Sequence, residues 1–167
     1  MTQIKYRKPN VSDAKSICSL VKNNEPLDKN SNYLYVLLCH HFSDTCVVAE
    51  MNSKIIGFMT GFIPPKYPQT LFVWQAAVDS EYRNKGIAQN LVSHALDQAG
   101  SEIKYVEATV TSSNKASLRF LENLADDLKT KFSLTPLFST DDLGKEHEPE
   151  DLIRIGPISR KFMEVTV

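Results

Sequence analysis

A nearly continuous apolar run that leads into an amphipathic segment constrains the fold of this chain most strongly. Residues 70–78 are mostly apolar or β-branched, which predicts a strand. Residues 79–86 are mostly polar, and apolar side chains then recur at helical spacing from Ile87 to Ala99. The pattern predicts a strand, a loop and an amphipathic helix in succession.

The rest of the chain also shows strand and helix patterns. Ser12 and Asp13 are predicted to cap a first helix, and residues 51–53 are predicted to form the turn of a β-hairpin. An acidic, proline-containing stretch from Ser139 to Asp151 is predicted to be a long loop. The other predicted elements are a strand at 3–7, helices at 14–21 and 33–42, strands at 45–50 and 54–63, a strand at 105–111, a helix at 115–124, and strands at 131–137 and 152–155.

Length, charge and hydropathy limit the possible classes of protein. With 167 residues and 42% hydrophobic content, we expect a single domain spanning residues 1–167. The 19 basic and 20 acidic residues nearly cancel, so the charge does not favour nucleic acid as a ligand. The N-terminus lacks a secretory pattern and no apolar stretch approaches membrane-spanning length, so we expect a cytoplasmic protein that does not bind a membrane.

The three cysteines, Cys18, Cys39 and Cys46, do not suggest a disulfide framework, because their number is odd and none forms a C-x-x-C pair. We expect them to be small buried apolar residues. Cys39, His40, His41 and Cys46 could also suggest a metal site, but adjacent histidines point in different directions and the spacing fits no standard zinc pattern. No metal is therefore assigned.

The loop before the helix at 87–99 has the composition of an anion site. The first N–H groups of a helix lack intrahelical partners, and the helix dipole places positive charge there. Gly86 allows close approach of a phosphate, small Ala88 allows tight packing, and Arg83 and Lys85 add charge. A pyrophosphate fits this loop, although an ordinary basic turn before a helix would look similar.

The order of the predicted elements and the string Arg83-x-x-Gly86-x-Ala88 resemble the GNAT superfamily of N-acetyltransferases. The resemblance implies an α/β (α+β) fold with a central mixed, mostly antiparallel sheet flanked by helices. It also implies that the strand at 70–78 splays from the strand at 105–111 to admit acetyl-CoA, the cosubstrate, with no metal. The residues that it places around acetyl-CoA are Ala76, Ala77, Val78, Arg83, Asn84, Lys85, Gly86, Ile87, Ala88, Asn114 and Ser117.

One position departs from the superfamily pattern. Many members carry a tyrosine seven residues after the asparagine that matches Asn114, and its hydroxyl protonates the leaving thiolate. This chain has Leu121 there. The general acid is therefore left unassigned, and water or another hydroxyl could return the proton.

A narrower resemblance lies in segments that acetyltransferases of different substrate do not share. Residues 26–35, 39–46, 71–78 and 147–155 are similar to the diaminobutyrate acetyltransferases of ectoine biosynthesis. The resemblance implies acetyl transfer to the 4-amino group of L-2,4-diaminobutyrate, a role in osmotic adaptation and a homodimer. Two alternatives remain: an acetyltransferase for another small amine, or a non-catalytic acyl-CoA-binding module.

A diamino acid needs acceptors for its ammonium groups and donors for its carboxylate. Its amine must also lose a proton before it attacks, because an aliphatic ammonium has a pKa of about 10.4. Glu107 or Asp28, acting directly or through water, is the candidate base. Capping of the helix at 33–42 is the alternative role for Asp28 and Asn30, and core packing is the alternative for Tyr33, Tyr35 and Trp74. The candidate acceptor-binding residues are Asp28, Asn30, Ser31, Tyr33, Tyr35, His41, Trp74, Gln75, His147, Glu148 and Glu150.

Overall fold

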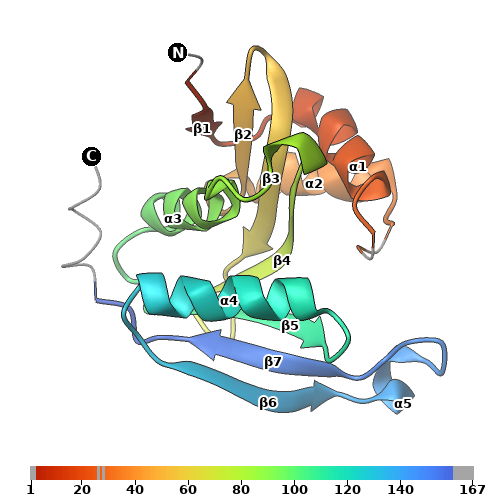
Figure 1. Cartoon of the computed structure of the whole chain (residues 1–167), viewed down its shortest axis with the longest axis vertical. Coiled ribbons are helices and arrows are strands. Elements are labelled where there is room, and N and C mark those ends of the chain that lie inside the picture. Colours follow the sequence, from red (N-terminus) through yellow and green to blue (C-terminus); the bar gives the residue numbers. More distant parts are fainter. Residues whose placement is uncertain (1–2, 26, 28, 160–167) are drawn as a thin grey trace. The chain divides into compact units, whose positions relative to one another are not determined.

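The computed structural model describes residues 3–25, 27 and 29–159, which cluster into two compact units (Figure 1). Unit 1 contains the described residues up to Ile63 together with Val73–Gly100. Unit 2 contains Pro64–Phe72 and the described residues from Ser101 onward. The boundary falls within one strand, β4 (Thr70–Val78), whose ends belong to different units.

Unit 1 contains most of the predicted N-terminal elements. The strands are β1 (Lys5–Arg7), β2 (Val47–Met51), β3 (Lys54–Phe62) and the second part of β4, and the α-helices are α1 (Ala14–Lys22), α2 (Asn32–His41) and α3 (Ile87–Ala99). Three short 3-10 helices are η1 (Val11–Asp13), η2 (Ser43–Thr45) and η3 (Ser80–Tyr82). Unit 2 adds β5 (Tyr105–Thr111), α4 (Lys115–Asp127), β6 (Phe132–Phe138), α5 (Thr140–Leu143) and β7 (Glu150–Ile155).

The sheet is mixed and mostly antiparallel, as predicted. Its strand order is β1-β2-β3-β4-β5-β7-β6. β1, β2 and β3 pair antiparallel, as do β5, β7 and β6, whereas β4 and β5 run parallel. The fold class expected from the sequence is confirmed.

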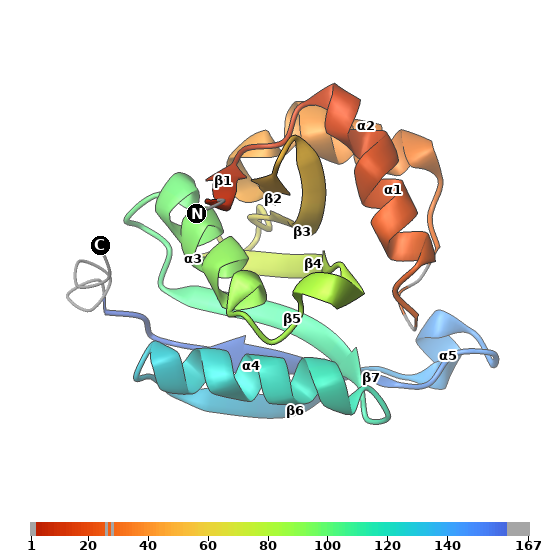
Figure 2. The same ribbon diagram turned by 45° about the horizontal axis from the view of Figure 1, so that its top comes forward.

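Helices cover both faces of the unit 1 strands (Figures 1 and 2). On one face, side chains of α1 and α2 form an apolar cluster with Val48 of β2 and Phe58 of β3. On the other face, a Cβ atom added to Gly57 would lie 3.4 Å from side-chain atoms of both Ile87 and Leu91 of α3. The glycine therefore lets α3 pack closely on the sheet. The predicted burial of all three cysteines is confirmed.

One local prediction held in part and another was wrong. Asp13 is the N-cap of α1, as predicted, but its side chain makes no cap bond to that helix. It serves instead in the capping box of η1, where the Asn10 side chain accepts from the Ser12 N–H and Asp13 accepts from the Asn10 N–H. The stretch from Ser139 to Asp151 is not one loop. Ser139 and Asp142 form a second capping box that starts α5, and β7 begins at Glu150.

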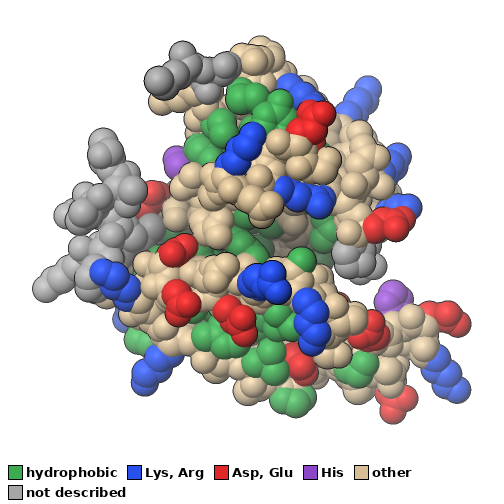
Figure 3. Space-filling view, viewed as in Figure 1, with side chains coloured by type: hydrophobic (Ala, Val, Ile, Leu, Met, Phe, Trp, Pro, Cys, Tyr) green, Lys and Arg blue, Asp and Glu red, His purple; other side chains and the backbone are tan. Residues whose placement is uncertain are grey.

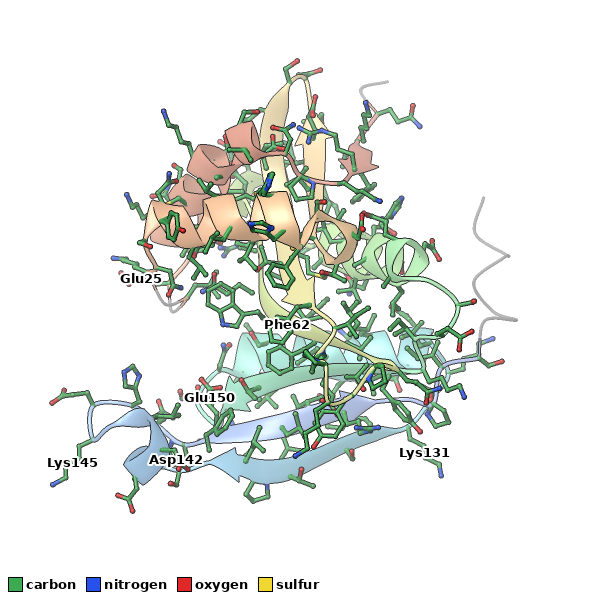
Figure 4. All side chains as sticks on the ribbon, turned by 180° about the vertical axis from the view of Figure 1, so that it is seen from behind. Glu25, Phe62, Lys131, Asp142, Lys145 and Glu150 are labelled. Carbon is green, nitrogen blue, oxygen red and sulfur yellow. The ribbon has the colours of Figure 1, made fainter. Side chains whose placement is uncertain are left out.

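Unit 2 packs α4 on the strands β5, β7 and β6. The buried residues of α4 are Leu121, Leu124 and Ala125. β6 is the edge strand and forms a hairpin with β7; Lys131 and Lys145 mark the two ends of this hairpin, and α5 lies in its connection (Figure 4). None of the described helices combines the length and apolar character needed to span a membrane.

Candidate active site

The predicted phosphate loop contains two residues with left-handed backbone angles and leads directly into α3. Asn84 and Gly86 both have left-handed backbone angles, φ 60° and φ 73°. Gly86 is the N-cap of α3, and the Asn90 N–H donates to its carbonyl at 3.1 Å to begin the helix. The first N–H groups of α3 have no partner within the helix, so they can bind an anion.

The side chain of Arg83 is held by the protein. Its Nε donates to the carbonyl of Val78 at 3.2 Å, and its Nη2 donates to Oδ1 of Asn24, at the end of α1. This arrangement was not foreseen, because Arg83 was expected only as a positive charge near the phosphates. Asn24 has no signal in the sequence that marks it, since 59 residues separate it from Arg83.

The backbone of β4 at residues 76–78 lies beyond the ladder that joins β4 to β5. The parallel register covers Thr70–Phe72 and Tyr105–Glu107, and among the described residues it extends no further, although β4 continues to Val78. On its other side β4 meets β3, where the Asp79 N–H donates to the Ile56 carbonyl at 2.8 Å. The short ladder agrees with the splayed pair implied by the family resemblance.

Asn114 and Ser117 lie at the start of α4 in unit 2. The Asn114 side chain caps this helix by accepting from the Ser117 N–H at 3.1 Å. Leu121 lies one turn further along the helix and is only 3% exposed. Many family members carry the tyrosine of the general acid at this position. In this chain the position is thus part of the apolar packing of α4.

Tyr35, Trp74 and Gln75 come together in unit 1. The Tyr35 hydroxyl donates to Oε1 of Gln75 at 2.9 Å, and both residues are buried. The rings of Tyr35 and Trp74 lie 6.4 Å apart, and Trp74 packs against the cluster below α1 and α2 while remaining partly exposed. Trp74 can therefore present an apolar wall, with Tyr35 and Gln75 fixed behind it.

The other candidates in unit 1 line the start and end of α2. Tyr33 is 68% exposed, and Ser31 is the N-cap of the helix without a side-chain cap bond. Asn30 precedes it, and exposed His41 lies edge-on to His40. Asp28 lies outside the described residues.

Glu107 belongs to a compact charged cluster in unit 2. Its buried carboxylate accepts from Nη1 of Arg154, its direct neighbour in the β5–β7 register. The Arg154 guanidinium also lies 3.8 Å from the ring centroid of Tyr105. The sequence analysis did not assign Arg154 to the site; only a known β5–β7 register would have revealed it.

His147, Glu148 and Glu150 follow α5. Glu148 accepts from the Ser113 hydroxyl at 2.7 Å, which ties it to the turn directly before Asn114. Glu150 pairs in register with Thr111 at the end of β5 (Figure 4). His147 is exposed, and its N–H donates to the Gly144 carbonyl at 3.0 Å.

Cys39 and Cys46 carry no reactive thiolate at neutral pH. Burial raises the pKa of Cys39 to about 12 and that of Cys46 to about 11. Within the described part of the chain, no three His, Cys, Asp or Glu side chains are grouped so that they could hold a metal ion.

The chain is similar to acetyltransferases along nearly all of its length. The Acetyltransferase (GNAT) family matches residues 14–125. The L-2,4-diaminobutyric acid acetyltransferase of Halalkalibacterium halodurans is 43% identical over 94% of this chain and 84% of that protein. The corresponding acetyltransferase of Marinococcus halophilus is 42% identical over 94% and 92%.

A solved structure shows the same similarity to a diaminobutyrate acetyltransferase. Diaminobutyrate acetyltransferase EctA from Paenibacillus lautus, in complex with its substrate L-2,4-diaminobutyric acid and coenzyme A, is 36% identical. The match covers 94% of this chain and 96% of that one, with a TM-score of 0.88. The chain therefore belongs to the GNAT acetyltransferases and, among them, to the L-2,4-diaminobutyric acid acetyltransferase family.

Proposed function

We propose that this enzyme transfers the acetyl group of acetyl-CoA to the 4-amino group of L-2,4-diaminobutyrate, giving N4-acetyl-L-2,4-diaminobutyrate for ectoine biosynthesis and osmoprotection. The observation that carries this proposal is the likeness to the EctA structure that holds diaminobutyric acid and coenzyme A. That likeness extends past residue 125, where the general family match ends. It therefore includes the C-terminal segment, which the sequence analysis assigned to the acceptor.

The loop geometry supports an acetyl-CoA role for residues 83–88. The left-handed Gly86 exposes backbone at the positive end of α3, where the pyrophosphate of CoA would bind. In the proposed complex, the backbone of residues 76–78 pairs with pantetheine, and an N–H near Val78 polarises the thioester carbonyl. The N-terminal turn of α4, with Asn114 and Ser117, would lie near the pantetheine arm.

The acceptor is proposed to bind beside Trp74, with carboxylates near its ammonium groups. Glu107 is buried, and its pairing with Arg154 fixes the orientation of its carboxylate. A carboxylate held in this way can accept a hydrogen bond from an ammonium group or from a water that carries away its proton. Glu107 and Asp28 remain the proposed base or water-relay residues.

We propose further that the enzyme is a cytoplasmic homodimer and that residues 1–167 form one acetyltransferase domain. Leu134, Leu137 and Phe138 of the edge strand β6 are exposed, and hydrophobic side chains follow this edge (Figure 3). An exposed apolar edge strand favours a protein partner, and a second copy would cover it. The coverage of the EctA chain supports the single-domain proposal.

The decisive test is thiol release from acetyl-CoA with L-2,4-diaminobutyrate, compared with L-ornithine, L-lysine and putrescine. The acetylated nitrogen of the product is located by NMR. A strong preference for diaminobutyrate with acetylation at N4 supports the proposal. Preferred turnover of another amine would leave only the acetyltransferase class, and CoA binding without turnover would favour a non-catalytic module.

A further inference from the structure

The peptide that joins Val78 to Asp79, at the end of β4, is held from two sides. The Asp79 N–H donates to the Ile56 carbonyl of β3 at 2.8 Å. The Val78 carbonyl accepts from Nε of Arg83 at 3.2 Å. Because the N–H and the carbonyl of a planar trans peptide point in opposite directions, these two bonds fix how the peptide is turned. Val78 is only 9% exposed, so water replaces such bonds poorly.

A buried acceptor fixes the other end of the Arg83 side chain. Nη2 of Arg83 donates to Oδ1 of Asn24, which is 8% exposed. The Asn24 side chain is itself held, since its Nδ2 donates to the Leu20 carbonyl in the last turn of α1 at 2.7 Å. Nε and Nη2 belong to one planar guanidinium, so fixing Nη2 also fixes the direction in which Nε donates. Arg83 therefore joins the end of α1 to the end of β4, and all of these bonds lie within unit 1.

We infer that Arg83 is a positioning residue for acetyl transfer, because its bond to the Val78 carbonyl sets the orientation of the Val78 N–H. The peptides that carry these two groups meet at the Val78 Cα, so holding one of them restricts the other. The inference rests on the proposed function, in which an N–H near Val78 polarises the thioester carbonyl. Such a donor stabilises the developing oxyanion only when it is directed at the oxygen, and removing one costs about 10²- to 10³-fold in rate. Arg83 thus acts on the transfer step, through the backbone of β4.

An arginine that only binds pyrophosphate through its charge is the alternative, so the test separates the charge from the Nε donor. Glutamine has a nitrogen at the position of Nε, because both nitrogens are bonded to Cδ, but it has no positive charge. Lysine keeps the charge and has a carbon at that position. Arg83→Gln therefore keeps a donor for Val78 and loses the one for Asn24. Arg83→Lys loses the donor for Val78, so each variant is the matched control for the other.

The experiment measures the rate of acetyl transfer to L-2,4-diaminobutyrate in a single turnover, which excludes product release, and the Kd of CoA by calorimetry. We expect Arg83→Lys to slow transfer at least about tenfold and to change the CoA Kd less than about threefold. Arg83→Gln should keep both quantities within about threefold of the unsubstituted enzyme. It should nevertheless melt at a lower temperature, because the buried Oδ1 of Asn24 loses its partner. Arg83→Met, which removes both charge and donor, should slow transfer as Arg83→Lys does.

Each outcome decides the inference. Undiminished transfer in a folded Arg83→Lys or Arg83→Met variant would overturn it, as would an Arg83→Gln variant as slow as Arg83→Lys. A CoA Kd at least about tenfold higher in Arg83→Gln but not in Arg83→Lys would assign Arg83 to the phosphates instead. If the unsubstituted enzyme acetylates no amine, the proposed function fails and the inference fails with it. If it acetylates an amine other than diaminobutyrate, only the proposed acceptor is wrong, and the Arg83 variants are compared with that amine.

Discussion

Substituting Gly86 tests the assignment of the phosphate loop. The backbone conformation of Gly86 predicts the effect on stability, and the open space around it predicts the effect on acetyl-CoA affinity. Its φ of 73° is unfavourable for a residue with a Cβ, but a Cβ built there meets nothing within 4 Å. The stability cost of Gly86→Ala is therefore backbone strain alone, about 1–2 kcal/mol. For a chain of this size, that cost lowers Tm by about 2–8 °C.

The effect on acetyl-CoA has a different origin. The open space around Gly86 is where a pyrophosphate would approach the backbone, so any side chain there should hold the phosphate away from the N–H groups. Losing one or two hydrogen bonds to a charged group costs about 1.5–3 kcal/mol. This loss corresponds to an acetyl-CoA Kd about 10- to 100-fold higher, measured by calorimetry.

Gly86→Asn separates the two effects, because asparagine tolerates the left-handed region better than alanine. We expect the Asn variant to be more stable than the Ala variant and yet to bind acetyl-CoA no better. Gly100→Ala is the control, since Gly100 also has positive φ and open surroundings. It should lose stability without losing affinity. Wild-type affinity in a folded Gly86→Asn variant would refute the loop assignment.

Three other predictions concern the acceptor, the fold and the thiols. Trp74→Ala should raise the KM for diaminobutyrate at least about fivefold while changing the acetyl-CoA Kd less than about threefold, because loss of the aromatic wall costs about 1 kcal/mol or more; equal effects on both ligands would contradict its placement. Asp13→Asn tests acid stability. Burial raises the pKa of Asp13, but hydrogen bonds from the Arg7 guanidinium and the Asn10 N–H lower it below its usual value of 3.8. The stabilisation from the Arg7–Asp13 ion pair is therefore complete at a pH well above 3.8 and is lost as the pH falls through the folded-state pKa. The stability difference between wild type and Asp13→Asn in urea should therefore be large at pH 7 and shrink toward pH 3; a constant difference would argue against this ion pair. Cys39 and Cys46, with pKa values of about 12 and 11, should react with a disulfide reagent at pH 8 only after unfolding, and rapid reaction of the native protein would contradict their burial.

Elements with strong local patterns could be predicted from the sequence. The apolar run at 70–78 and the strand at 105–111 match β4 and β5, and the helical spacing from Ile87 to Ala99 matches α3. In each of these segments one pattern of apolar residues dominates, and polar residues mark the ends of the segment. The short helix α5 was missed, although Ser139 and Asp142 have the spacing of a capping box. The acidic and proline-containing composition around them favoured a loop instead.

The contacts that organise the candidate site could not be predicted, because they join residues far apart in the chain. Glu107 and Arg154 are 47 residues apart and meet only through the register of β5 with β7. Tyr35 and Gln75 are 40 residues apart and meet through the packing of α2 on β4. Sequence patterns identify which face of an element is buried. They do not specify which polar groups meet across that face.

The proton balance of the proposed reaction shows what Leu121 implies. An ammonium that becomes an amide releases two protons, and the leaving thiolate takes back only one. Any group that removes protons from the nitrogen can therefore donate one of them to the sulfur, directly or through water. A thiolate whose thiol has a pKa of about 8.5 is a much weaker base than an alkoxide, so it needs less help from a general acid to leave. Leu121 is a buried residue of α4, so its side chain contributes to the packing of unit 2. The lack of a hydroxyl at this position is thus compatible with turnover, provided that water or a group that deprotonates the amine returns a proton to the thiolate.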